Sequence, residues 1–181
     1  MSEAVSLLEA LAEILSNGVL AWGLAACGVA QLSKLLIELV VHRRWRPAVL
    51  VETGGMPSSH SALMTGTTAA LGWELGFGDP LFALAAVLSF IVLYDASGVR
   101  RAAGLTAQRV NGLPDGLWDV RPLAGDPAAA PVLRPLKENL GHTRPEVLIG
   151  SLMGPLVALP GLALLGSPWQ IAQQAGWLPL G

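Results

Sequence analysis

Two histidines and one glutamate are the residues of this chain best suited, by type and spacing, to do chemistry. His142 and Glu146 lie four residues apart, so on one helical turn the carboxylate can hydrogen-bond one ring nitrogen and orient the other. This is the arrangement of an activated nucleophile. His60, far upstream, can give or take a proton near neutral pH. A surface His–Glu pair is the plainer interpretation of the same spacing.

The stretch that contains His60, TGGMPSSHSA (residues 53–62), has the composition of a helix start that binds an anion. Its glycines let the backbone turn freely, and its proline suits the first turn of a helix. Ser58 and Ser59 offer hydroxyl groups beside the free N–H groups of that helix start, which attract anions. The stretch predicts a site for a phosphate whose leaving group needs a proton. The alternative is a capped helix with an incidental histidine.

Basic residues are available to neutralise such a phosphate. We expect Lys137, Arg100 and Arg101 to bind the phosphate oxygens and to neutralise the charge that develops during transfer. Lys34 shares a helical face with Glu38, and ionisable groups at membrane depth usually point into the protein. The alternatives are headgroup anchoring for the two arginines and a Lys34–Glu38 pair at the membrane surface.

The composition places these groups in a membrane protein. Of the 181 residues, 52% are hydrophobic and 13% are charged, whereas a soluble domain carries about 25% charged residues. The mean hydropathy is +0.55. The predicted fold class is all-α, a polytopic membrane helical bundle. The lone Cys27 excludes a disulfide within one chain.

The apolar runs predict about four spanning helices, because about 20 apolar residues cross the hydrocarbon layer. An amphipathic helix (1–17) precedes them, a cytoplasmic loop (111–135) interrupts them, and an interfacial tail (167–181) follows. With short extramembrane helices they form a single membrane-embedded domain, 1–181. The pairs Gly72–Gly76 and Gly150–Gly154 have a spacing that lets helices approach closely. The expected spans are residues 18–41, 60–77, 81–99 and 147–166.

Four spans would place every lysine and arginine on one side of the membrane. The basic segments follow the first span and lie between the third and the fourth, whereas the opposite side carries only acidic residues. The positive-inside rule then places the basic side in the cytoplasm and both termini outside. The same topology gathers the polar clusters around His60, Arg100 and His142 at one membrane depth. We therefore expect the two imidazoles to meet around one anion site.

Three ordered motifs carry a resemblance to a known family. TGGMPSSHSA (53–62), YDASGVRRAAG (94–104) and LKENLGHTRPEV (136–147) together resemble the divergent bacterial and plastid branch of the type 2 phosphatidic acid phosphatase superfamily. This branch is also called acid phosphatase/vanadium-dependent haloperoxidase-related. The resemblance covers roughly residues 30 to 155.

The resemblance implies roles for both histidines. In the superfamily the second motif is Pro-Ser-Gly-His, and its histidine protonates the leaving group; His60 matches that histidine, with Ser59 in place of glycine. In the third motif a histidine becomes phosphorylated, and an aspartate follows after three intervening residues. His142 and Glu146 match this pair, with glutamate in place of aspartate.

The phosphate-binding positions of the superfamily are matched in part. Its first motif is lysine, six residues, then Arg-Pro. Lys34 fits the lysine, but Arg43 comes too late and the Arg46–Pro47 pair comes later still. The arginine of the third motif falls at Leu136, one residue before Lys137. The predicted substrate-binding residues are Lys34, Arg43, Ser58, Ser59, Asp95, Arg100, Arg101 and Lys137.

The resemblance implies a metal-independent phosphatase without a cofactor. His142 would attack phosphorus in line, His60 would protonate the departing oxygen, and water would hydrolyse the phosphohistidine. A membrane-embedded site implies a lipid phosphate such as phosphatidate, phosphatidylglycerophosphate or a prenyl diphosphate. Membrane lipids are the expected partners, and no nucleic acid is expected. The expected location is a bacterial inner membrane, or a plastid or thylakoid membrane, with the site facing the cytoplasm.

Other functions remain open from the sequence. The altered motifs would also suit a non-catalytic lipid-binding, transport or assembly protein on a phosphatase scaffold. A metal-dependent CDP-alcohol phosphotransferase is faintly similar around Asp95, Asp115 and Asp119, although Gly98 stands where a second aspartate is needed. A haloperoxidase would place vanadate in the same pocket. The glycine-rich helix faces are compatible with a homodimer.

Overall fold

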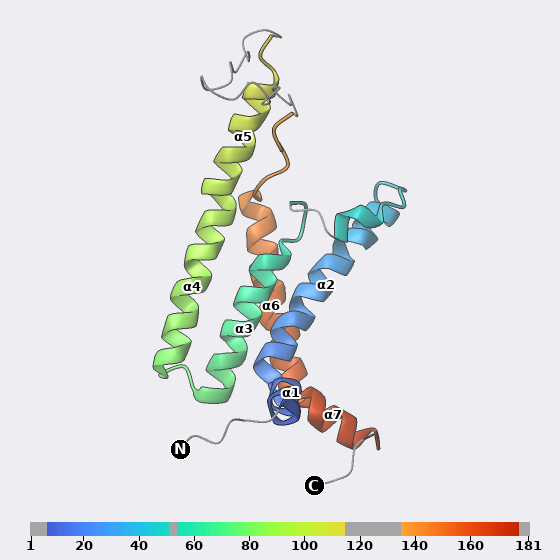
Figure 1. Ribbon diagram of the computed structural model, residues 1–181, viewed down its shortest axis with the longest axis vertical. Coiled ribbons are helices and arrows are strands. Elements are labelled where there is room, and N and C mark those ends of the chain that lie inside the picture. Colours follow the sequence, from blue (N-terminus) through green and yellow to red (C-terminus); the bar gives the residue numbers. More distant parts are fainter. Residues whose placement is uncertain (1–6, 51–53, 115–134, 178–181) are drawn as a thin grey trace.

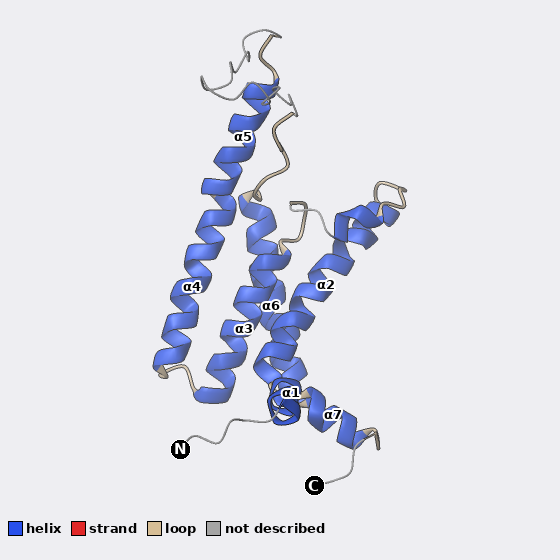
Figure 2. Ribbon diagram, in the orientation of Figure 1, coloured by secondary structure: helices blue, strands red, loops and turns tan. Residues whose placement is uncertain are grey.

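The computed structural model describes residues 7–50, 54–114 and 135–177. Within these ranges the chain consists of helices and the loops that join them (Figure 2). The predicted all-α membrane bundle is therefore confirmed for the described part. Asp115 and Asp119, and most of the predicted loop 111–135, lie outside it.

Four helices form the bundle: α2 (Gly18–Val40), α3 (Ser59–Leu75), α4 (Pro80–Ser97) and α6 (Arg144–Leu165). They run side by side, and α3 contacts each of the other three (Figure 1). Each corresponds to one of the predicted spans. Helices α2 and α6, and the helical stretch Pro80–Asn111 with its turn at Gly98, are long and apolar enough to cross a membrane. The fourth, α3, has 17 residues and is rich in small residues that pack against protein.

The helical stretch that contains the third span is longer than the sequence predicts. After Gly98, α4 continues into α5 (Val99–Asn111), and together they make a helical stretch of 32 residues. Such a stretch is about 48 Å long, whereas the hydrocarbon layer is about 30 Å thick. Helix α5 therefore extends beyond the apolar layer, at the end of the bundle where α6 begins (Figure 1).

The opposite end of the bundle carries α1 (Leu7–Ser16), α7 (Pro168–Gln174) and the turn between α3 and α4 (Figure 1). The α5 end carries the basic segments that the predicted topology places on one side of the membrane. A short 3₁₀-helix, η1 (Pro47–Leu50), also lies there, packed against α2. The structure thus brings the three polar clusters to one end of the bundle.

Glycines set the close approach of α3 and α6. A methyl group on Gly154 would lie 2.5 Å from the backbone nitrogen of Gly66, and one on Gly66 would lie 3.2 Å from the carbonyl oxygen of Gly154. These contacts match the expected role of the Gly150–Gly154 pair. The expectation for Gly72–Gly76 was wrong, because Gly76 ends α3 with φ +92° and Gly72 faces Phe77 and Phe82 instead of another small-residue face.

Candidate active site

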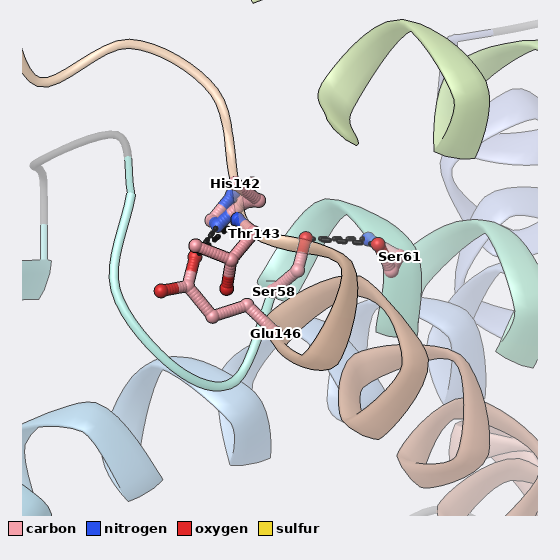
Figure 3. Close-up of polar contacts among 5 residues, drawn as sticks. All are labelled: Ser58, Ser61, His142, Thr143 and Glu146. Atoms are coloured by element: carbon pink, nitrogen blue, oxygen red, sulfur yellow. Dashed lines mark hydrogen bonds and ion pairs between the residues drawn. The ribbon is translucent and has the colours of Figure 1, made fainter. Parts of the chain in front are cut away.

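The nucleophile candidate and its orienting acid lie at the start of α6. Nδ1 of His142 lies 3.1 Å from Oε2 of Glu146, and the backbone N–H of Thr143 donates to the same oxygen at 3.1 Å. Figure 3 shows the carboxylate reaching back to both groups. Glu146 is the N3 residue of a capping box whose N-cap is Thr143. The glutamate that caps the helix start therefore also orients the imidazole through Nδ1.

His142 is held from the other side by α4 and α5. Its backbone N–H donates to the carbonyl of Ala96 at 2.9 Å, and the side chain is 5% exposed. The preceding Gly141 has φ +74°, and a methyl group there would lie 2.7 Å from the Arg101 Cα. Glycine is needed at this position both for its conformation and for the contact with the start of α5.

The two histidines line one small cavity. Its volume is about 40 Å³, and its lining includes His60, His142, Asp95 and Arg100. That volume has room for roughly three water molecules. Arg100 Nε donates to Asp95 Oδ2 at 2.5 Å, so the guanidinium is held at the rim. The structure therefore places His60 and His142, with a cation, on the lining of one cavity.

A larger cavity lies beside the small one and shares Gly141 with it. It has a volume of about 430 Å³ and is lined by three cations, Lys34, Arg46 and Arg101, and by the carboxylates of Glu38 and Glu146. Lys34 is only 5% exposed, and a buried ammonium needs an anion to offset its lost hydration. Three cations face two carboxylates here, and one of these, Glu146, already accepts from His142 and Thr143. The cavity is therefore suited to an anionic ligand.

The serines before His60 have structural contacts. Ser58 is the N-cap of α3, and its Oγ accepts from the backbone N–H of Ser61 at 3.3 Å and from Ser61 Oγ at 2.9 Å (Figure 3). Its backbone N–H donates to the carbonyl of Glu146 at 3.0 Å. Ser58 and Ser59 are buried and line neither cavity. Ser58 therefore fastens α3 to α6, as the capped-helix alternative implies.

Two predicted cations lie away from both cavities. Lys137 is exposed on the segment before His142, and Arg43 is exposed after α2; neither contributes to a cavity lining. Arg43 has φ 51°, a left-handed turn that redirects the chain. Arg46 and His42 line the larger cavity instead. The signal for Arg46 was its position before Pro47, which matches the Arg-Pro of the first motif at a longer spacing.

The residues of the metal-dependent alternative are not assembled in the described ranges. Asp95 pairs with Arg100, while Asp115 and Asp119 lie outside those ranges. Across residues 7–50, 54–114 and 135–177, no group of three or more His, Cys, Asp or Glu side chains is placed to hold a metal ion.

The environment of His142 favours its neutral form. Burial lowers the pKa of the imidazole below the usual 6.5, and the charge of Lys34 acts in the same direction. The hydrogen bond and charge of Glu146, and a backbone hydrogen bond with Gly55, oppose this shift. Because the net pKa shift is downward, the ring has a free lone pair at neutral pH, as a nucleophile needs.

Sequence comparison agrees with the fold and the motifs. The chain belongs to the Divergent PAP2 family, whose profile matches residues 15–157. It is also 40% identical over 150 residues to the uncharacterized membrane protein YuiD of Bacillus subtilis (strain 168), a match that covers 81% of this chain and 95% of the relative. None of the solved structures matches the chain. The chain is therefore a membrane protein related to the PAP2 phosphatases.

A pair of lysine variants tests the assignment of the larger cavity. We expect Lys34→Met to lower kcat/KM for dioctanoyl phosphatidate about 100-fold, because the variant removes a buried cation from the lining of the larger cavity. Lys137→Met removes a lysine that lies outside both cavities and should change kcat/KM less than twofold. The measurement is phosphate release by the purified protein in detergent. Equal losses in the two variants would show that charge near the site, and not the cavity, matters.

Proposed function

We propose that this protein is an integral membrane phosphatase that hydrolyses a lipid phosphate through a phosphohistidine intermediate. The observation that carries the proposal is the pair of imidazoles on one cavity, with His142 oriented by Glu146. Membership of a PAP2-related family supports the class of reaction. The cations of the adjoining cavity support an anionic substrate.

The chemistry follows from the atoms around the small cavity. Nε2 of His142 attacks phosphorus, the bond from phosphorus to the lipid oxygen breaks, and its electron pair stays on that oxygen. His60 donates a proton to the departing oxygen. Water then attacks the phosphohistidine with His60 as the base, the P–N bond breaks, and inorganic phosphate leaves. Glu146 stabilises the imidazolium that forms. Arg100 binds phosphate oxygens in the small cavity, and Lys34, Arg46 and Arg101 attract the anionic headgroup from the adjoining cavity.

The membrane position of the site supports a lipid as the substrate. The cavities lie at one end of apolar helices, near the level at which phospholipid headgroups would lie, and we place this end in the cytoplasm by the positive-inside rule. A single cysteine at Leu113, in a Cys27→Ala background, tests the orientation. A membrane-impermeant maleimide should label it only after the cells are opened; labelling of intact cells would reverse the assignment.

The intermediate can be sought directly. The purified protein is mixed briefly with radiolabelled lipid phosphate, denatured in alkali, and digested. We expect label on the peptide that contains His142 in the native chain, and none in His142→Gln. Label elsewhere, or phosphate release without a labelled peptide, would contradict the mechanism. Loss of activity in EDTA would instead favour the metal-dependent phosphotransferase.

The pH dependence of kcat/KM should report His142. Because the pKa of this imidazole is below 6.5, activity should persist to pH values lower than 6.5 and fall once the ring is protonated. Glu146→Gln removes the charge that stabilises the imidazolium, so the acidic limb should move to still lower pH while kcat falls. By linkage, the free energy of unfolding should decrease as the pH drops below 6.5, because the unfolded chain binds the proton more tightly. An acidic limb above pH 6.5 would contradict this assignment.

A second candidate is a non-catalytic lipid phosphate-binding protein on the same scaffold. The positions of Arg43 and Lys137 outside both cavities favour it, because a phosphatase of this class needs a full set of cations around the transferred group. Binding of dioctanoyl phosphatidate by the native chain, without phosphate release from any lipid phosphate, would support this candidate.

A further inference from the structure

The segment that leads to His142 depends on α5 for its position. From Pro135 to Thr143 the chain has no helix or strand, and it runs beside α5 toward the start of α6 (Figure 1). A methyl group on Gly104 would lie 2.6 Å from the carbonyl oxygen of Glu138 and 2.8 Å from that of Leu140. Close docking on α5 therefore takes the place of regular secondary structure in this segment.

Asn111, the last residue of α5, fastens the far end of that segment. Its Nδ2 donates to the carbonyl of Leu136 at 2.8 Å and to Oε1 of Glu138 at 2.8 Å. Its Oδ1 accepts from the backbone N–H of Leu136 at 2.9 Å. One carboxamide thus uses a donor group and an acceptor together, which neither aspartate nor leucine can do.

We propose that Asn111 is a positioning residue for His142, acting through the segment 136–142; this role rests on the proposed phosphatase function. The segment is anchored at two ends, by Asn111 at Leu136 and by the Ala96 carbonyl at His142. Gly141 packs against the backbone of Arg100 and Arg101 between them. Loss of the Asn111 anchor lets the segment shift along α5, and His142 moves relative to His60, which belongs to α3.

The test compares variants that differ by a single amide group. Asn111→Asp keeps the acceptor for the Leu136 N–H, removes both donated bonds, and places a carboxylate opposite Glu138. We expect kcat for dioctanoyl phosphatidate to fall about tenfold, as for a small misplacement of a reacting group, with KM within twofold of the native value. Adding Glu138→Gln to Asn111→Asp supplies an amide donor to the new carboxylate and should restore most of kcat. Gln108→Glu, the same chemical change at an exposed position of α5, should leave kcat within twofold.

A readout that needs no turnover separates this role from the proposed function. Diethyl pyrocarbonate modifies accessible imidazoles, and His142 is nearly buried, so its modification in the native chain should be slow. We expect at least fivefold faster modification in Asn111→Asp, native rates in Gln108→Glu, and recovery with Glu138→Gln. If the native protein releases no phosphate from any lipid phosphate, the proposed function fails, and the modification rates still decide the role of Asn111.

Unchanged kcat and unchanged His142 modification in Asn111→Asp would overturn the proposal, as would failure of Glu138→Gln to restore them. Asn111→Ser, which keeps one hydroxyl beside Leu136, is the milder variant if Asn111→Asp yields too little folded protein. Its kcat and its rate of His142 modification are then measured in the same way.

Discussion

His142→Gln is expected to lower phosphate release by about 10⁴-fold or more, since removing a covalent nucleophile leaves only binding and electrostatic effects. Glutamine has a similar length and can still face Glu146, so the capping box of α6 should persist. The measurement is single-turnover phosphate release from dioctanoyl phosphatidate by protein in detergent micelles. Thermal unfolding of the same samples should give native-like midpoints.

The control for this prediction separates chemistry from binding. His142→Gln should still bind the lipid phosphate with an affinity near that of the native chain, because Lys34, Arg46 and Arg101 are intact. Residual activity within tenfold of native would exclude His142 as the nucleophile. A matching loss in His60→Ala for alkyl phosphates, but a smaller loss for aryl phosphates whose leaving groups need no proton, would support His60 as the acid.

Gly154→Val is expected to have the largest effect on stability. A side chain at this position would meet the Gly66 nitrogen at 2.5 Å and the Ala62 carbonyl oxygen at 2.6 Å. Both are backbone atoms of α3, so neither can swing aside, and the two helices must separate. We expect the free energy of unfolding to fall by about 3 kcal/mol, measured by thermal or denaturant unfolding in detergent.

Gly28→Ala is the matched control for this change. Gly28 also lies in a membrane helix, but a methyl group there has nothing within 4 Å. Alanine is favoured over glycine inside a helix by about 1 kcal/mol, so stability should stay equal or rise slightly. A loss for Gly28→Ala as large as that for Gly154→Val would mean that any glycine replacement disturbs the bundle, and the contact argument would fail.

The four bundle helices and their grouping could be predicted from the sequence. Apolar runs placed the first span at 18–41, and α2 covers Gly18–Val40. The alternation of spans then required the clusters around His60 and His142 to share one end, and in the structure both residues line one cavity. These predictions succeeded because helix length and membrane crossing depend on composition summed over many residues.

Individual side-chain directions were not predictable in the same way. Whether Arg43 or Arg46 reaches the larger cavity depends on one left-handed residue and a 3₁₀ turn, which apolar periodicity does not encode. The sequence allowed the hydroxyl of Ser58 to bind either an anion or the N–H groups of the helix start. In the structure it accepts the capping hydrogen bonds. The continuation of α4 into α5 was also missed, because α5 is polar and packs against the segment before His142 instead of apolar neighbours.

Ser58 stands two residues before His60, and Glu146 stands four residues after His142. The Ser58 N–H donates to the Glu146 carbonyl, so this hydrogen bond joins the two segments that carry the histidines. The spacing of His60 and His142 thus depends on this contact between α3 and α6, together with the docking of residues 136–142 on α5. Heat inactivation should consequently coincide with the opening of these contacts, and a protein warmed to just below that temperature should keep full catalytic competence.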